Sequence, residues 1–206
     1  GEKLLQERYE TTKRATAFYE NQMLDFLNEE MREFIGHQTM VFVATSDSQG
    51  NCDSTFRAGS KGFVRVIDNQ TLIYPEYRGN GVMASLGNIV ENPHVGLMFI
   101  DFFKHTIGLH INGAAEIMDN EQLTSLNIAE DMMNDIKEEE GSKPERWVVI
   151  RVEEAYIHCS KHIPKLRYLD KEIDWGTDDD IKKGGDFFKA KQTKREHASN
   201  KPLRRL

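Results

Sequence analysis

Short apolar segments separated by turn residues fill the middle of this 206-residue chain and restrict its fold more than any other feature. Residues 40–46 (MVFVATS) have the composition of a strand, and residues 47–50 (DSQG) have that of a tight turn. The pattern recurs, and the predicted strands are 40–46, 53–57, 63–67, 71–74, 94–100 and 107–117, followed by 147–152 and 155–159 as one long strand or a strand pair. Parallel neighbours need a crossover of about a dozen residues or more, and most of these connections are shorter. The sequence therefore predicts a mainly β fold with flanking helices, a mostly antiparallel, Greek-key-like barrel rather than a doubly wound parallel sheet.

Helical patterns flank this β region. Residues 23–34 place apolar side chains at helical spacing between acidic ones, with Gly36 as the expected stop. Residues 121–139 and 82–90 are also predicted to be helical, and residues 3–21 have the polar, helix-permissive composition of an arm that packs on a partner. These patterns divide the chain into a helical arm (1–37), a barrel domain (38–168) and a basic tail (169–206).

The formal net charge of −7 is unevenly distributed. Residues 182–206 hold nine Lys or Arg against two acidic residues, so the preceding part carries −14. An acidic body argues against a dedicated nucleic-acid binder. No apolar run approaches the roughly 20 residues of a membrane span, and the first residues lack the apolar core of a signal peptide. Cys52 and Cys159 could pair but make no disulfide framework, so the simpler expectation is a reduced, cytoplasmic setting. Charge and hydropathy together predict no nucleic-acid and no membrane partner.

Residues 74–81 (YPEYRGNG) join a predicted strand to the predicted helix 82–90. Arg78 and Asn80 stand where the backbone N–H groups of a helix start point outward unpaired and the helix dipole is positive. This arrangement favours an anion, and a phosphate group is the expected one. The alternative is a turn that holds no ligand, as most Gly-x-Gly turns do.

Two further cations precede this segment. Arg57 and Lys61 are four residues apart, and both can face one anion only if the chain bends at Gly59 and Gly62. Arginine presents a planar fork that matches phosphate oxygens, so this pair would complete a phosphate site. Otherwise the two side chains are solvated charges at the edge of a strand.

The chain resembles the pyridoxamine 5′-phosphate oxidase-like flavoproteins, the FMN-binding split-barrel superfamily. Three segments carry the resemblance: residues 53–66, with RAGSKGFV starting at Arg57; residues 74–99, with YPEYRGNG, NIVENP and GLMF; and residues 157–161 (IHCSK). The resemblance spans residues 38–168. It implies a split β-barrel and a homodimer with two equivalent FMN sites at the subunit interface.

The resemblance also implies site residues. Those expected at the FMN phosphate are Arg57, Lys61, Arg78, Asn80 and Ser85, and those expected along the isoalloxazine ring are Thr55, Phe56, Tyr74 and Glu76. The oxidase proper has Ser-Arg-Lys where this chain has Gly79-Asn80-Gly81, and the C-terminal arginine and histidine that grip the pyridoxal ring are not recognisable here. The resemblance therefore favours a flavin site over vitamin B6 chemistry.

The function expected from these patterns is an FMN-dependent oxidoreductase acting on an unidentified small-molecule substrate. The alternatives are a flavin-binding or storage protein without turnover, and an enzyme of the same fold that uses a deazaflavin or haem. No residue stands out as an acid–base catalyst, which fits hydride transfer at the flavin itself.

Several side chains have two interpretations. His158 and Lys161 lie where a substrate could approach the flavin, or they mark an exposed strand end. Glu76 accepts a hydrogen bond from a flavin ring N–H or from Arg78, or it forms a surface salt bridge. His158, Cys159 and His162 are too isolated to predict a metal site.

Overall fold

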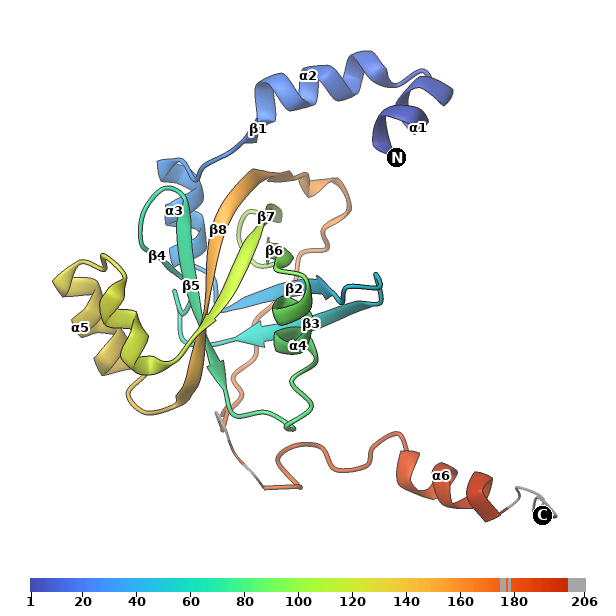
Figure 1. Ribbon diagram of the computed structural model, residues 1–206, viewed down its shortest axis with the longest axis vertical. Coiled ribbons are helices and arrows are strands. Elements are labelled where there is room, and N and C mark those ends of the chain that lie inside the picture. The colour runs from blue at the N-terminus through green and yellow to red at the C-terminus, as the bar shows by residue number, and fades with distance from the viewer. Residues whose placement is uncertain (175–176, 178, 200–206) are drawn as a thin grey trace. The chain divides into compact units, whose positions relative to one another are not determined.

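The computed structural model describes residues 1–174, 177 and 179–199, with side chains to residue 195. These residues belong to two units, Gly1–Asp170 and a second unit that begins at Lys171. Within the second unit, residues Ala190–Ser199 form helix α6. The first unit holds a large sheet and the remaining helices (Figure 1). These are α1 (Glu2–Arg8), α2 (Thr12–Gln22), α3 (Glu29–Gly36), α4 (Ala84–Glu91) and α5 (Glu130–Glu139), with 3₁₀ turns η1 (Asn120–Ser125) and η2 (Ser160–His162).

The sheet has eight strands, and all of its neighbouring pairs are antiparallel. They are β1 (Met23–Leu24), β2 (Met40–Ser46), β3 (Cys52–Ala58), β4 (Arg65–Val66), β5 (Thr71–Tyr77), β6 (His94–Asp101), β7 (Ile107–Met118) and β8 (Pro144–His158). Their order is β3-β2-β6-β7-β8-β5-β4, with β1 on β8. The predicted antiparallel fold is confirmed, but the sheet does not close, because β3 and β4 are its unpaired ends within the first unit.

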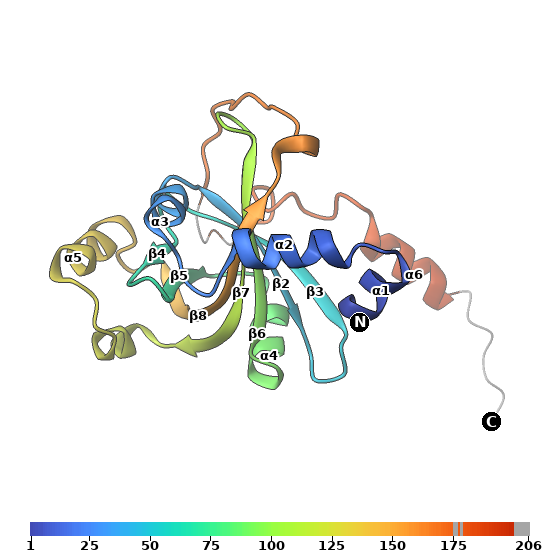
Figure 2. The same ribbon diagram turned by 90° about the horizontal axis from the view of Figure 1, so that it is seen from above.

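The inner face of the curved sheet forms the core. Alternate residues on three adjacent strands are buried there: Val41 and Val43 of β2, Leu97 and Phe99 of β6, and Leu109 and Ile111 of β7. Successive side chains of a strand point to opposite faces, so the residues between them lie on the outer face. Helix α4 packs against β2, β3 and β7, and Figure 2 shows it beside the β2–β3 hairpin.

A second apolar cluster lies under α5. Leu123 of η1 and Ile136 of α5 pack there against Ile73, Trp147 and Val149 from β5 and β8. The indole Nε1 of Trp147 donates to Asn120 Oδ1 at 2.9 Å, so the buried polar group of this side chain is satisfied. The predicted helix over 121–139 was therefore wrong as one element, since the non-helical residues 126–129 separate η1 from α5.

The predicted bounds changed most on either side of the YPEYRGNG segment. Strand β5 continues to Tyr77, three residues beyond the predicted end, although it contains Pro75. This proline opposes Trp147 of β8, whereas β4 pairs only with residues 72 and 73. The chain beside Pro75 is thus a sheet edge, where a missing N–H donor costs no ladder bond. Helix α4 starts at Ala84 rather than Val82.

The N-terminal segment is helical, with one interruption that the sequence did not indicate. Met23 and Leu24 pair with Tyr156 and Ala155 of β8, so helix α3 begins only at Glu29. The Asn28 side chain accepts from Met31 N at 2.9 Å and caps that start. Helices α1 and α2 bury none of their residues.

None of the helices in the described part of the chain is both long and apolar enough to cross a membrane.

Candidate functional site

Strand β3 turns Thr55 and Arg57 to the same face, because residues two apart on a strand point the same way. The guanidinium of Arg57 meets the carboxylate of Glu76 on β5, with Nε donating to Oε2 at 2.9 Å and Nη2 donating to Oε1. Its third nitrogen, Nη1, donates to Thr55 Oγ1 at 2.5 Å. Two predicted ring contacts and one predicted phosphate contact are therefore joined in a single network.

Tyr74 precedes Glu76 by two residues on β5 and is completely buried. Its hydroxyl has no hydrogen-bond partner among the described residues. Burial raises the pKa of Tyr74 far above its usual value, and the negative charge of Glu76 adds to this shift while Arg57 opposes it. A fully buried side chain has no surface open to a ligand in this structure, so its contact with a flavin stays a prediction.

The loop between β5 and α4 carries Arg78 and Asn80, which are both exposed. Asn80 Oδ1 accepts from Val82 N at 3.0 Å, and this bond shapes the turn. Helix α4 then begins at a left-handed Met83 without a side-chain cap, as α1, α2 and α5 also do, whereas Asn28 caps α3. The first N–H groups of α4 are therefore left for solvent or a ligand.

Ser85, in the first turn of α4, is buried and donates to Asp53 Oδ2 at 2.9 Å. Asp53 lies on the same face of β3 as Thr55 and Arg57, so this bond places the start of α4 on the face of β3 that carries the Arg57 network. Three cations were predicted to bind a phosphate here, and two carboxylates, Asp53 and Glu76, accompany them. The site is less positive than the sequence suggested.

Two predicted residues stand apart from this network. Lys61 lies in the turn after β3 and is exposed. Phe56 points to the opposite face of β3 from its neighbours Thr55 and Arg57, and 52 % of its surface is exposed. The structure therefore does not bring Thr55 and Phe56 to one face of the strand within a single chain.

Phe56 belongs instead to a row of half-exposed side chains that crosses the outer face of the sheet. Strand pairing sets these residues side by side, and the outer row is Phe56, Phe42, Met98, His110 and Tyr156. Phe42 and Phe56 meet edge to face at 5.5 Å between centroids, and His110 stacks on Tyr156 at 4.8 Å.

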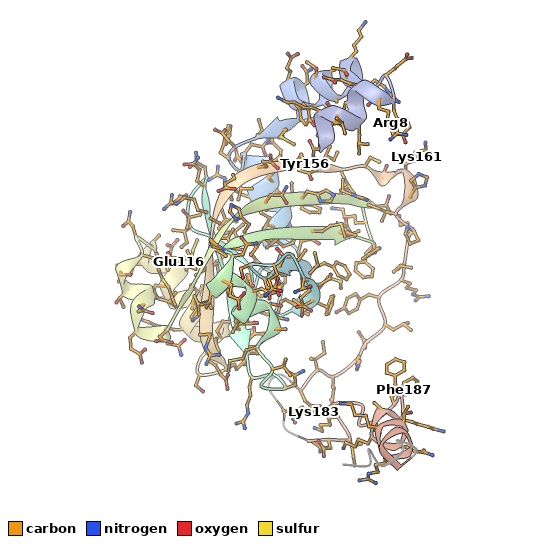
Figure 3. The ribbon with its side chains drawn as sticks, turned by 45° about the vertical axis from the view of Figure 1, so that its right-hand side comes forward. Arg8, Glu116, Tyr156, Lys161, Lys183 and Phe187 are labelled. Atoms are coloured by element: carbon orange, nitrogen blue, oxygen red, sulfur yellow. The ribbon has the colours of Figure 1, made fainter. Side chains whose placement is uncertain are left out.

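The predicted substrate residues lie at the end of β8. His158 Nδ1 and His110 Nε2 are 2.9 Å apart, so one ring donates and the other accepts. Burial, with the neighbouring His158 as a smaller cause, lowers the pKa of His110 and favours its neutral form. Lys161 is exposed in η2, and Figure 3 shows it beyond Tyr156 at the end of the strand. Among the described residues no group of three or more His, Cys, Asp or Glu side chains could hold a metal ion.

Sequence reasoning missed Asp53 and the outer row. The acid at position 53 was visible, but its partner Ser85 lies 32 residues away and becomes a neighbour only when α4 folds onto β3. The sequence did not indicate the outer row because both faces of β2 and β6 are apolar. Without an alternation of apolar and polar residues, the pattern does not show which side chains face outward.

Comparison with known proteins gives the chain a family. The family model described as pyridoxamine 5′-phosphate oxidase matches residues 27–159. No curated protein matches. Among solved structures, HupZ from Group A Streptococcus is 21 % identical, with 64 % of this chain and 93 % of that chain covered and a TM-score of 0.46.

Two other solved structures are similar in outline. A putative pyridoxamine 5′-phosphate oxidase from Lactobacillus delbrueckii is 22 % identical, with 66 % and 98 % of the two chains covered and a TM-score of 0.46. HutZ, the haem storage protein from Vibrio cholerae, is 15 % identical, with 64 % and 94 % covered and a TM-score of 0.44. The assignment itself rests on the family model, which spans more than half of the sequence. This chain belongs to the pyridoxamine 5′-phosphate oxidase family.

Proposed function

We propose that this chain binds FMN where β3, the β5–α4 loop and the start of α4 meet, and that it is an FMN-dependent oxidoreductase of unidentified substrate. One observation carries this proposal: the bond from Ser85 to Asp53 holds the uncapped start of α4 against the face of β3 that presents Arg57. A phosphate there would meet helix N–H groups and a guanidinium. Family membership supports a flavin as the molecule that bears the phosphate.

The residues present fit such a group. The fork of Arg57 already holds a carboxylate in two-point contact, which is the geometry that a phosphate would need. Arg78 and Asn80 on the exposed loop, with Lys61 in the turn after β3, would approach the phosphate from solvent. Bound FMN would supply two-electron chemistry, and this chain would bind, orient and shield it.

The family resemblance implies a homodimer, and we propose further that its two copies pair through the outer row. This row exposes aromatic and Met side chains on the outer face of the sheet, a composition typical of protein interfaces. Phe56 would then contact a flavin bound at the interface from the face opposite to Thr55. His158 and Lys161, at the end of β8, would contact the substrate.

The bound molecule distinguishes these assignments. We expect the purified protein to be yellow, and mass spectrometry of the released ligand to identify FMN. A haem spectrum, a deazaflavin mass, or a colourless protein that takes up no added FMN would contradict the proposal. If FMN is bound and a nicotinamide donor bleaches it, the protein turns over electrons; no reduction by any donor tested would favour storage.

The phosphate assignment is tested with Arg78→Ala. Loss of a charge-assisted contact costs about 1.5–3 kcal/mol, so we expect FMN affinity to fall at least tenfold while riboflavin affinity stays nearly unchanged. Titration of flavin fluorescence measures both. Arg8→Ala, on the exposed face of α1, is the control and should affect neither ligand. Equal losses for FMN and riboflavin after Arg78→Ala would rule out a phosphate contact at this residue.

A further inference from the structure

We propose that Glu76 is an internal anion that occupies the guanidinium of Arg57 until a phosphate-bearing ligand displaces it, and that this exchange favours dianionic ligands over monoanionic ones. The inference deepens the proposed function and rests on it where the ligand is FMN. It assigns to Glu76 a role in specificity, different from the ring contact or surface salt bridge that the sequence suggested.

Each nitrogen of the Arg57 guanidinium already donates a hydrogen bond. Its Nε and Nη2 both donate to Glu76, and its Nη1 donates to Thr55 Oγ1. All three nitrogens of the guanidinium are therefore engaged. A phosphate can take the two-point position only after the carboxylate of Glu76 has left it.

The ion pair of Arg57 and Glu76 lies where solvent can reach one of its members. Strands β3 and β5 are not neighbours in the sheet, so the contact spans the opening between its two ends. The Arg57 side chain is 23 % exposed, but that of Glu76 is only 9 % exposed. A ligand can therefore reach Arg57 from solvent, while Glu76 holds it from the protein side.

A phosphate monoester and the Glu76 carboxylate differ in charge. A phosphate monoester carries about −1.5 to −2 at neutral pH, against −1 for a carboxylate, so the guanidinium gains from the exchange only with a dianion. A neutral ligand such as riboflavin offers Arg57 nothing in return for Glu76. The contact thus lowers the affinity for any ligand that must displace Glu76 from Arg57, and only a dianion binds the guanidinium more strongly than the carboxylate does.

The displaced carboxylate of Glu76 would need a new hydrogen-bond donor. A carboxylate this deeply buried needs another donor. Tyr74 lies two residues earlier on the same face of β5, and its buried hydroxyl has no partner among the described residues. The Tyr74 hydroxyl is close enough for the charge of Glu76 to raise its pKa. It would donate to the displaced carboxylate in place of Arg57.

The decisive variant is Glu76→Gln, which keeps the size of the side chain and removes its charge. We expect its Kd for FMN to fall about tenfold, which corresponds to about 1.4 kcal/mol, while its Kd for riboflavin changes less than about twofold. Inorganic phosphate, used alone as a probe, should raise the Tm of Glu76→Gln but not that of the wild type. The double variant Arg57→Met/Glu76→Gln should lose this response.

Two further variants support the comparison. Asp135→Asn breaks another arginine–carboxylate pair, with Arg65 at 3.0 Å, and should leave phosphate and flavin binding unchanged. Should Glu76→Gln not fold, Glu76→Asp serves instead, because its shorter side chain breaks the two-point contact and should tighten FMN binding by a smaller factor.

The outcomes separate this inference from the proposed function. Weaker FMN binding in Glu76→Gln would make Glu76 a positioning residue for Arg57 and overturn the inference, while leaving the FMN site intact. Equal phosphate responses of wild type and variant would also overturn it. If no flavin binds any variant but phosphate stabilises Glu76→Gln alone, the FMN assignment fails and the exchange at Arg57 stands for another phosphate ester.

Discussion

At the scale of single residues, close packing of the backbone leaves room only for glycine at position 113. The register of β7 against β8 shifts between Asn112 and Gly113, which is a β-bulge. A Cβ on Gly113 would lie 2.1 Å from the carbonyl oxygen of Arg151. No side chain fits there unless the two central strands separate.

We therefore expect Gly113→Ala to lower the free energy of unfolding by at least about 2 kcal/mol, near the upper part of the range for single substitutions. Urea unfolding followed by circular dichroism measures the change. Gly87→Ala is the matched control: no atom lies within 4 Å of its Cβ position in helix α4, so the protein should gain about 0.5–1 kcal/mol. Equal effects of the two substitutions would show that the close contact at Gly113 is not limiting.

At the scale of elements, the end of β5 is attached to the end of α5. The hydroxyl of Tyr77, the last residue of β5, donates to Glu140 Oε2 at 2.6 Å. Glu140 follows α5 and is 2 % exposed, and its other oxygen, Oε1, has no hydrogen-bond partner among the described residues. Burial, and then the bond to Glu140, raise the pKa of Tyr77, so it stays a donor at neutral pH. This bond fixes the end of β5 at the residue directly before Arg78 and its loop.

Tyr77→Phe should lower the free energy of unfolding by about 1–3 kcal/mol, because it removes a hydrogen-bond donor from a buried carboxylate. The chain contains its own control. Tyr19 makes the same type of bond to Glu2 Oε2 at 2.7 Å, but in an exposed position, so Tyr19→Phe should change stability by less than about 0.5 kcal/mol. Thermal and urea unfolding of both variants test the difference. Similar losses would mean that burial of Glu140 contributes little.

Which elements form was largely predictable, and where they begin was not. Strand β2 occupies the predicted residues 40–46 because apolar composition and the following turn act locally. Helix α3 starts six residues later than predicted, since pairing of Met23 and Leu24 with β8 overrides the helical pattern. That pairing depends on strands more than 130 residues away along the chain, which a local pattern cannot contain.

At the scale of the whole molecule, the outer row is the surface through which we propose that two copies pair. Its residues come from five strands, and only pairing across the sheet makes them one surface. Phe18 of α2 adds an edge-to-face contact with Tyr156 at 5.7 Å, so the N-terminal arm leaves the body next to this row.

Met98→Glu should therefore abolish the proposed dimer, because it places a charge in the middle of the row. Sedimentation velocity should show a dimer for the wild type and a monomer for Met98→Glu, with unchanged circular dichroism. Val90→Glu is the control, since Val90 is 76 % exposed on α4 and lies outside the row. A monomeric wild type, or a dimeric Met98→Glu, would exclude the outer row as the interface.

The sequence alone determined the antiparallel β class, most of the strands and the loop that carries Arg78, because these depend on composition and spacing over a few residues. The tertiary structure decided which side chains meet: Arg57 with Glu76, Ser85 with Asp53, and Tyr77 with Glu140. These contacts join residues 19, 32 and 63 positions apart. Register, strand twist and burial bring them together, and these are properties of the folded sheet rather than of any segment.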